Sequence, residues 1–322
     1  MSFAVEIENL TARYAGGTII GPVSLAVHQG EIVSLLGPSG CGKTTVLRML
    51  AGFVPVSAGT IRLRGADVTQ AHPHRRGIAL VFQDFALFPH LSVFDNIAFG
   101  PRRHGIGRAE TSQRVERLIA QMRLDGLATR YPAALSGGQR QRVAIARALA
   151  IEPAVVLLDE PFSSLDTRLR ETTRIELRAI QQEIGFTTIL VTHDQGEALS
   201  ISDRVAVMQA GRLEQFGTAF DVYHRPANRF VADFVGRANP VPGGVVRPES
   251  ISVVDAGTPE GIDATIISVA FLGGDSEIVV ETTEGIRMIV TADGTAPQRY
   301  KPGSRVALTW PKEAIISFGE DV

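Results

Sequence analysis

Lysine is scarce in this chain of 322 residues, which holds three lysines against 29 arginines, and only Lys43 falls within the first 300 residues. The two side chains are not interchangeable, because the ammonium group of lysine is a compact charge on a flexible stem whereas guanidinium is a rigid planar fork. A lysine can pass between backbone amides to reach a single phosphate oxygen. Position 43 therefore marks a place where the chemistry requires an ammonium group.

Other absences narrow the kinds of protein that this chain can be. A single cysteine, Cys41, excludes an internal disulfide and fits a reducing compartment. No apolar run approaches the ~18 residues needed to cross a bilayer, and the first residues lack the basic and apolar regions of a secretory signal. The formal net charge of −2 provides no overall field that would attract nucleic acid or anionic lipid. We expect a cytoplasmic protein with no nucleic-acid partner, which would serve a membrane only through another subunit.

Hydrophobic residues make up 44% of the chain, which is enough for a core in one large or two modest domains. Several apolar runs are unbroken rather than alternating, which is typical of strands covered on both faces. Helical patterns lie between them, such as the spacing of Leu177, Ile180 and Ile184, and this order predicts an α/β layer. The predicted strands lie at 31–36, 77–82, 154–160, 187–194 and 204–208.

The stretch from about residue 84 to residue 150 has a different character. It is mostly helical in pattern, and the spacing of Val115, Leu118, Ile119 and Met122 fits one buried helix face. We interpret this stretch as a helical subdomain inserted into the α/β core.

Prolines and glycines between residues 237 and 244 mark a linker. The runs beyond it are short and β-rich, and turn residues separate them. We predict a first domain over residues 1–238 and a small all-β barrel of the OB type over residues 243–322. The predicted strands of the second domain lie at 264–273, 276–283, 286–292, 304–310 and 314–318.

The segment GPSGCGKTT around Lys43 fits the pattern G-x-x-x-x-G-K-[ST] of a phosphate-binding loop. In such a loop backbone N–H groups surround the phosphates and the threonine hydroxyl binds Mg²⁺. A predicted strand precedes the segment and a helical pattern follows it, which is the context that the motif requires. We therefore assign nucleotide binding to Gly37, Pro38, Ser39, Gly40, Cys41, Gly42, Lys43, Thr44 and Thr45.

Two adjacent acids, Asp159 and Glu160, follow five apolar residues at the end of a predicted buried strand. A carboxylate at that position can hold Mg²⁺ directly or through water, and the next one can polarise an attacking water. Together with the phosphate loop, the pair indicates hydrolysis of a nucleoside triphosphate.

The segment LSGGQ at residues 135–139 indicates a second anion site. Ser136 can cap a helix whose first turn contains Gly137 and Gly138, so that free amides and the positive end of the helix dipole face outward. Each glycine costs a helix up to ~1 kcal/mol. We therefore expect these glycines to permit the close approach of a ligand.

In combination, these motifs resemble the nucleotide-binding subunit of ATP-binding cassette (ABC) importers, followed by a domain similar to the transport-associated OB (TOBE) domain. The resemblance covers essentially the whole chain, and it implies a P-loop NTPase fold and an ATPase that uses ATP and Mg²⁺. It also implies that Tyr14 stacks on adenine. Gln83 would reach Mg²⁺ and the attacking water, and would sense the membrane partner.

The same resemblance implies a role for each remaining motif residue. Asp159 would assist the metal together with Thr44 and Gln83, and Glu160 would be the general base. His193 would contact the γ-phosphate, and Asp166 would couple two active sites.

The resemblance further implies the assembly. Ser136, Gly137, Gly138 and Gln139 would complete the ATP site of a second copy, so the active form is expected to be a head-to-tail homodimer. Transmembrane permease subunits and, indirectly, an extracytoplasmic solute-binding protein would be partners, with this chain peripheral on the cytoplasmic side of the inner membrane. The aromatic stretch at residues 83–93 could contact a permease helix or pack within the helical subdomain.

An alternative is a soluble ABC ATPase with a regulatory ligand-binding C-terminal domain. Relatives that act in DNA repair insert a long coiled coil, and those that act in translation carry two cassettes, and this sequence has neither feature. The single short C-terminal domain most resembles the branch that imports polyamines, ferric iron or sulfate. The solute itself is selected by other subunits.

Cys41 lies inside the phosphate loop, beside the start of a helix and near Lys43, and both neighbours favour a thiolate. We expect maleimide to alkylate Cys41 in the nucleotide-free protein, and ATP to protect it.

Overall fold

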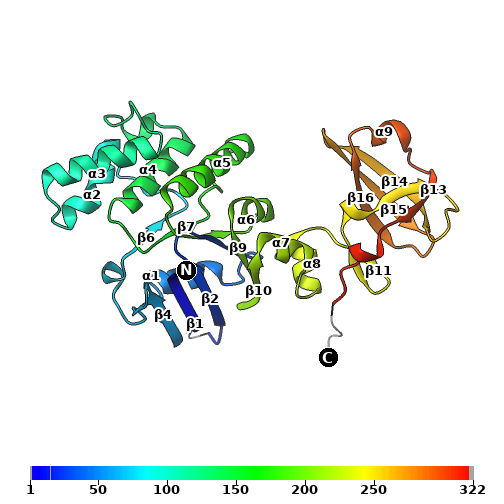
Figure 1. Ribbon diagram of the computed structural model, residues 1–322, viewed down its shortest axis with the longest axis horizontal. Coiled ribbons are helices and arrows are strands. Elements are labelled where there is room, and N and C mark those ends of the chain that lie inside the picture. The colour runs from blue at the N-terminus through cyan, green and yellow to red at the C-terminus, as the bar shows by residue number, and fades with distance from the viewer. Residues whose placement is uncertain (1, 15, 319–322) are drawn as a thin grey trace. The chain divides into compact units, whose positions relative to one another are not determined.

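The computed structural model describes residues 2–14 and 16–318, and the chain divides into two compact units, Met1–Ala219 and Phe220–Val322 (Figure 1). The boundary between the units follows residue 219, whereas the sequence predicted a first domain that ends at residue 238. Residues 220–238 group with the β-rich unit. Residues 1, 15 and 319–322 of the predicted domains lie outside the described residues.

A six-stranded sheet forms the centre of the first unit. Its strand order is β10-β9-β3-β8-β7-β6, and all neighbours are parallel except β9 and β10. Every residue of β3 and of β8 is buried, as expected for unbroken apolar runs covered on both faces. The five strands predicted from the sequence are therefore confirmed. The bounds are β3 Ile32–Leu36, β6 Ile78–Val81, β7 Val155–Asp159, β8 Thr188–Thr192, β9 Arg204–Gln209 and β10 Arg212–Thr218.

An antiparallel sheet that the sequence analysis missed lies beside this parallel sheet. Its strand order is β2-β1-β4-β5. The sequence signal for this sheet was an alternation of apolar and polar residues in β1, where Val5 and Ile7 are buried and Glu6 and Glu8 are less buried. Register shifts interrupt the pairing of β1 with β2, which breaks the period along the strand. The bounds are β1 Phe3–Arg13, β2 Ile19–His28, β4 Ala58–Leu63 and β5 Ala66–Asp67.

The stretch predicted as a helical subdomain contains three helices, α2, α3 and α4. Helix α2 packs against both α3 and α4, and α4 packs against α5, so the four helices form one layer (Figure 1). The predicted helix face is buried, since Val115, Leu118, Ile119 and Met122 are at most 8% exposed. The helices of the first unit are α1 Lys43–Ala51, α2 Val93–Arg103, α3 Arg108–Gln121, α4 Gly137–Leu149, α5 Thr167–Ile184 and α6 Gln195–Ile201.

Two hydrophobic cores cover the two faces of the parallel sheet. Successive residues of a strand point to opposite faces, and in β7 this places Val156 and Leu158 in the core formed with α2, α4 and α5. Val155 and Leu157 lie in the other core, which the antiparallel sheet and α1 complete. The sheet therefore holds its strand ends rigidly between two packed layers.

The second unit contains a five-stranded antiparallel sheet with the order β13-β17-β14-β15-β16 and a short ribbon of β11 and β12. The predicted strand at 314–318 is wrong, because Lys312–Ala314 forms a 3₁₀ turn after Pro311 and Ile316 makes only an isolated bridge to Val245. The other four predictions are confirmed as β14 to β17. The bounds are α7 Ala219–His224, α8 Arg229–Val235, β11 Asn239–Val241, β12 Gly244–Val246, β13 Ser252–Asp255, β14 Ile262–Phe271, β15 Asp275–Thr282, β16 Arg287–Asp293, α9 Ala296–Arg299 and β17 Arg305–Thr309.

Arg247 explains why residues before the predicted linker belong to this unit. Its buried guanidinium donates to the carbonyl oxygens of Tyr223 and Ala232 at 2.7 Å each and of Arg237 at 3.0 Å. The same group lies 4.3 Å from the centre of the Tyr223 ring. Burial and a hydrogen bond to Glu249 raise the pKa of Tyr223 to about 12. One side chain thus fastens α7 and α8 to the chain that follows them.

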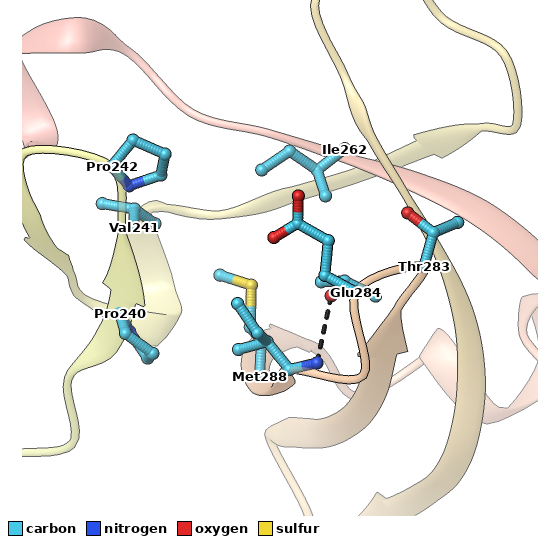
Figure 2. Close-up of a pocket in the computed structure, with 9 residues that line it drawn as sticks. Pro240, Val241, Pro242, Ile262, Thr283, Glu284 and Met288 are labelled. Atoms are coloured by element: carbon cyan, nitrogen blue, oxygen red, sulfur yellow. Dashed lines mark hydrogen bonds between the residues drawn. The ribbon is translucent and has the colours of Figure 1, made fainter.

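The second unit also contains a pocket of about 320 Å³ (Figure 2). Its walls are largely apolar, and the carboxylate of Glu284 extends toward Ile262 from the turn between β15 and β16. The remaining lining residues are Pro240, Val241, Pro242, Thr282, Thr283, Ile286 and Met288.

Candidate functional site

The carboxyl ends of β3, β6, β7 and β8 meet at one edge of the parallel sheet. Ligands of open α/β sheets bind outside this edge, because the loops that leave adjacent strands converge there. The phosphate loop follows β3, Glu160 follows β7, and His193 follows β8. Sheet order thus gathers residues that lie more than 100 positions apart in the sequence.

The loop between β3 and α1 closes around the ammonium group of Lys43. This side chain is 5% exposed, and its Nζ donates to the carbonyl oxygens of Gly37 at 2.7 Å and Pro38 at 2.9 Å. A Cβ at Gly37 would lie 2.4 Å from the carbonyl oxygen of Met208, so the loop passes too close to β9 for any side chain. Gly42, with φ of 103°, takes the left-handed turn into the helix.

The first turn of α1 presents its amide groups without a protein partner. Gly42 provides no side-chain cap and the turn contains no acidic residue, so the unpaired N–H groups and the helix dipole both favour an anion. This end of the helix borders a pocket of about 320 Å³. Its lining residues are Tyr14, Thr18, Ile20, Ser39, Gly40, Gly42, Lys43, Thr44, Thr45 and Glu160.

The structure does not support the expected reaction of Cys41 with maleimide in the folded protein. Cys41 is only 5% exposed and packs in the core that includes α1 and β3. Its Sγ lies 3.8 Å from the Nζ of Lys43 and fills the space that a Cβ at Gly37 would need. The thiol packs between the loop and the hydrophobic core. Only the backbone of Cys41 can therefore take part in a phosphate site.

We therefore expect native protein to react slowly with maleimide, whether or not ATP is present, because a buried structural cysteine is inert. Unfolding in denaturant should release one reactive thiol per chain. Mass spectrometry of time points with and without denaturant measures both rates. Rapid labelling of the folded protein would contradict the burial of Cys41.

Asp159 and Thr44 bring two side-chain oxygen atoms together beside the phosphate loop. The hydroxyl of Thr44 lies 3.5 Å from Oδ1 of Asp159, in the direction that lets it donate to the carboxylate. Burial raises the pKa of Asp159, and the charge of Glu160 also raises it, while Arg48, Thr44 and Lys43 oppose the shift. A bound cation would offset this burial cost, so the donor set fits Mg²⁺, which takes few carboxylates and completes its shell with water and phosphate oxygens. In the described part of the chain, no group of three or more His, Cys, Asp or Glu residues could hold a metal without such additional ligands.

Glu160 and His193 face each other at the same edge of the sheet. Nδ1 of His193 lies 3.2 Å from Oε1 of Glu160, and the histidine side chain is 55% exposed. Glu160 has a φ of 47°, in the left-handed region that non-glycine residues rarely adopt. Such strain concentrates at functional positions, where surrounding contacts maintain it. Here the amide of Glu160 donates to Val191 at 3.0 Å and the hydroxyl of Ser163 donates to the Glu160 carbonyl at 2.8 Å.

Two other predicted residues lie at the margin of this site. Tyr14 is half-exposed, and its hydroxyl is 3.4 Å from the hydroxyl of Thr45, so its ring borders the pocket. Gln83 is exposed two residues after β6, at the same sheet edge, and it is not part of the pocket lining.

The segment at residues 135–139 forms the start of α4 and does not line the pocket. Ser136 and Gln139 make a reciprocal capping box, which the sequence analysis predicted only as a cap by Ser136. The two glycines approach neighbouring residues, since a Cβ at Gly137 would lie 2.5 Å from Leu165 and one at Gly138 would lie 2.9 Å from Thr173. Packing against α5 and the turn before it therefore accounts for both glycines without a ligand.

Asp166 also has a structural role within the chain. It caps α5 by accepting a hydrogen bond from the amide of Leu169 at 3.0 Å. It is exposed and separate from the pocket lining.

The parallel sheet, its phosphate loop, the acid pair after β7 and the histidine after β8 define a P-loop ATPase of the ABC type. The sequence profile of the ABC transporter domain matches residues 20–163, and that of the TOBE domain matches residues 244–318. The chain belongs to the family of ATP-binding subunits of ABC importers, as its relatives show. It is the ATP-hydrolysing subunit of such an importer.

Two relatives match almost the whole chain. The spermidine/putrescine import ATP-binding protein PotA of Rubrobacter xylanophilus is 40% identical, with 98% of this chain and 94% of the relative aligned. The Fe(3+) ions import ATP-binding protein FbpC of Rhizobium etli is 42% identical, with 97% and 96% aligned. The solved structure of cbiO1 from Clostridium perfringens, part of the ABC transporter complex cbiONQ, is similar with a TM-score of 0.64 and 30% identity over 69% of this chain and 91% of that one. The alternative of a soluble ABC ATPase is not favoured, because these relatives are import proteins.

The sequence analysis missed several side chains at this edge of the sheet. Thr18 and Ile20 enter the pocket from β2 and the turn before it, which were not predicted. Arg170, Thr192 and Glu197 surround the Glu160 and His193 pair. Thr192 belongs to the predicted strand TTILVTHD. The spacing of residues in that strand does not show which acidic or basic side chain will contact Thr192 after folding.

Proposed function

We propose that the pocket beside the phosphate loop binds ATP with Mg²⁺. The observation that carries the proposal is the Glu160 and His193 contact at the rim of a pocket whose floor is the uncapped start of α1. Lys43 and the loop amides would hold the phosphates, and Tyr14 would stack on adenine. Thr44 and Asp159 would hold the metal, with Gln83 reaching it when the site closes. Bound Mg²⁺ would neutralise charge on the phosphate oxygens.

In the hydrolytic step, Glu160 accepts a proton from the attacking water. His193 would hold the Glu160 carboxylate through Nδ1 and would contact the γ-phosphate. The catalytic residues are thus Glu160, His193 and Gln83.

The start of α4 supports a second role, as the part of the ATP site that another copy completes. Ser136, Gly137, Gly138 and Gln139 lie outside their own pocket, so they are free to serve a partner in a head-to-tail homodimer. Asp166 would lie between the two sites. The local packing of the glycines is compatible with this role, because Ser136 remains exposed while its hydroxyl caps the helix.

The membrane partners follow from the family. We propose that permease subunits bind the segment that follows Gln83, with a solute-binding protein acting indirectly, and that the chain is peripheral on the cytoplasmic side of the inner membrane. Among the described helices, none is long and apolar enough to cross a bilayer. Arg147 fixes this segment by donating to the carbonyl oxygens of Phe85 and Ala86 at 3.1 and 2.7 Å.

The solute that we propose is a polyamine or ferric iron, as in the names of the relatives. Uptake of labelled putrescine, spermidine and Fe³⁺ is measured in cells that lack this chain. These cells should lose uptake either of the polyamines or of Fe³⁺. Restored uptake on return of the gene identifies the solute, and unchanged uptake of all three would refute this part of the proposal.

Asp159→Asn should raise the melting temperature of the nucleotide-free protein near neutral pH. Because burial raises the pKa of Asp159 above its ordinary 3.8, the stability that this one group contributes is fully present below that value and is lost as pH rises through the folded pKa. Asparagine removes the buried charge, and we expect a gain of roughly a few degrees. The variant should lose the further stabilisation that wild type gains from Mg²⁺ with ATP.

Thermal unfolding at several pH values, with and without EDTA, measures both effects. Wild type should hydrolyse ATP with Mg²⁺ and stop with EDTA. A variant that still shows the full Mg²⁺-dependent stabilisation would remove Asp159 from the metal site.

A further inference from the structure

A smaller pocket of about 120 Å³ also borders Glu160, and no residue of the phosphate loop lines it. Its lining includes the catalytic pair and a group of charged side chains with no assigned role. The lining residues are Glu160, Ser163, Arg170, Thr192, His193, Asp194 and Glu197. Two loops meet here, the one from Glu160 to Asp166 and the one that carries His193 between β8 and α6.

Arg170 holds the first of these loops by its backbone. From the first turn of α5, its Nε donates to the carbonyl oxygen of Phe162 at 3.2 Å and its Nη2 donates to that of Leu165 at 3.1 Å. The planar fork of guanidinium suits two such acceptors at once. Arg170 therefore fixes the path of the chain between the catalytic carboxylate and the cap of α5.

The same guanidinium group faces two carboxylates, that of Asp194 in the second loop and that of Glu197 in the first turn of α6. Its Nη1 lies 3.8 Å from Asp194 and its Nε lies 3.9 Å from Glu197. The side chains of Arg170 and Asp194 are each about one-third exposed, so their ion pair contributes little to stability. Glu197 differs, because its side chain is only 5% exposed and an unpartnered buried charge is costly.

Glu197 in turn fixes both neighbours of His193. Its Oε2 accepts from the hydroxyl of Thr192 at 2.6 Å, and that hydroxyl accepts from the amide of Asp194 at 2.9 Å. The carboxylate of Asp194 caps α6, because it accepts a hydrogen bond from the amide of Glu197 at 2.9 Å. The backbone on each side of the histidine is thus tied to one buried carboxylate.

We propose that Arg170 and Glu197 are positioning residues that hold the loop of Glu160 and the loop of His193 in a single arrangement. The Nδ1 to Oε1 contact of 3.2 Å between the catalytic pair depends on the relative position of these loops. A displacement of either loop is transmitted through the guanidinium group to the other. This inference rests on the catalytic roles proposed for Glu160 and His193, and neither Arg170 nor Glu197 touches the nucleotide pocket.

A purely structural ion pair is the competing explanation, and it makes different predictions. Loss of a structural pair lowers the melting temperature and leaves turnover per folded molecule unchanged. Loss of a positioning pair lowers kcat while ATP affinity stays the same, because the phosphate loop is untouched. Misplacing a reacting group by about 1 Å can cost roughly 100-fold in rate.

The test compares Arg170→Gln, Glu197→Gln and the double variant with Arg168→Gln as a matched control. Arg168 lies on the same turn of α5, is exposed and is remote from the pocket. For each purified variant, kcat, KM and the equilibrium Kd for ATP are measured, with folding checked by circular dichroism. We expect each single variant to lose roughly 10- to 100-fold in kcat with Kd changed less than about threefold. The double variant should be no slower than the slower single variant, since residues that act as one unit are not additive.

Arg170→Lys separates charge from geometry. Lysine keeps the charge that Glu197 needs but cannot bond both carbonyl groups, so its kcat should lie between those of wild type and Arg170→Gln. If Arg170→Gln does not fold, Glu197→Gln alone carries the test, because the amide keeps the size of the side chain.

Turnover within twofold of wild type in a folded Glu197→Gln or Arg170→Gln protein would overturn the inference, as would strictly additive losses. Absence of hydrolysis in wild type and in Arg168→Gln would instead refute the proposed function. The two failures are therefore distinguishable.

Discussion

Glu160→Gln should reduce ATP turnover by about two to four orders of magnitude, the range expected on loss of a general base. Glutamine keeps the shape of the side chain and can still meet His193, but it cannot accept the proton of the attacking water. ATP binding should remain, because Lys43 and the amides of α1 are unaffected. In the proposed head-to-tail homodimer, unhydrolysed ATP would remain between the two copies, so size-exclusion chromatography with ATP should show the variant as a dimer.

The control for this variant is Ser164→Ala, an exposed neighbour in the same loop. It should hydrolyse ATP at the wild-type rate and return to monomer after turnover. A Glu160→Gln protein that stays monomeric while hydrolysing ATP normally would remove Glu160 from the catalytic role.

Lys43→Arg should weaken ATP binding by roughly 10- to 100-fold, which corresponds to the loss of one charge-assisted hydrogen bond. The charge is conserved in this variant, so the effect reports shape alone. The ammonium group lies between the carbonyl oxygens of Gly37 and Pro38 at 2.7 and 2.9 Å, and Cys41 closes the space behind it. A planar guanidinium cannot enter without displacing the loop.

Isothermal titration with a slowly hydrolysed ATP analogue gives the two dissociation constants. Lys312→Arg, at an exposed position of the second unit, is the matched control and should bind as wild type does. Equal affinity of Lys43→Arg and wild type would show that arginine serves equally well, and the scarcity of lysine would then need another explanation.

Patterns in the sequence predicted those features that depend on neighbours in the chain. The nearly continuous apolar runs identified β3, β6, β7, β8 and β9, because strands covered on both faces do not alternate between apolar and polar residues. The phosphate loop was found through the spacing of its glycines around Lys43. The contact between Glu160 and His193 was not predicted, and the sheet order, which places β7 beside β8, explains it.

Features that depend on distant packing could not be predicted. The reason for Gly137 and Gly138 is the approach of Leu165 and Thr173, which lie about 30 residues further along the chain. The direction of the Cys41 thiol depends on the core beneath the loop, and motif spacing does not report it. The contact of Arg170 with Glu197 likewise exists only after α5 and α6 have packed.

The left-handed backbone at Glu160 sets two demands that no single residue type meets well. With φ at 47°, the position favours glycine first and then asparagine or aspartate, whose short side chains tolerate this conformation. Reaching His193 at 3.2 Å requires the longer side chain of glutamate. Replacements that relax the backbone would therefore shorten or delete the carboxylate, and a search for thermostable variants should enrich such changes here. Selection for stability alone would therefore favour replacements of Glu160 that inactivate the enzyme.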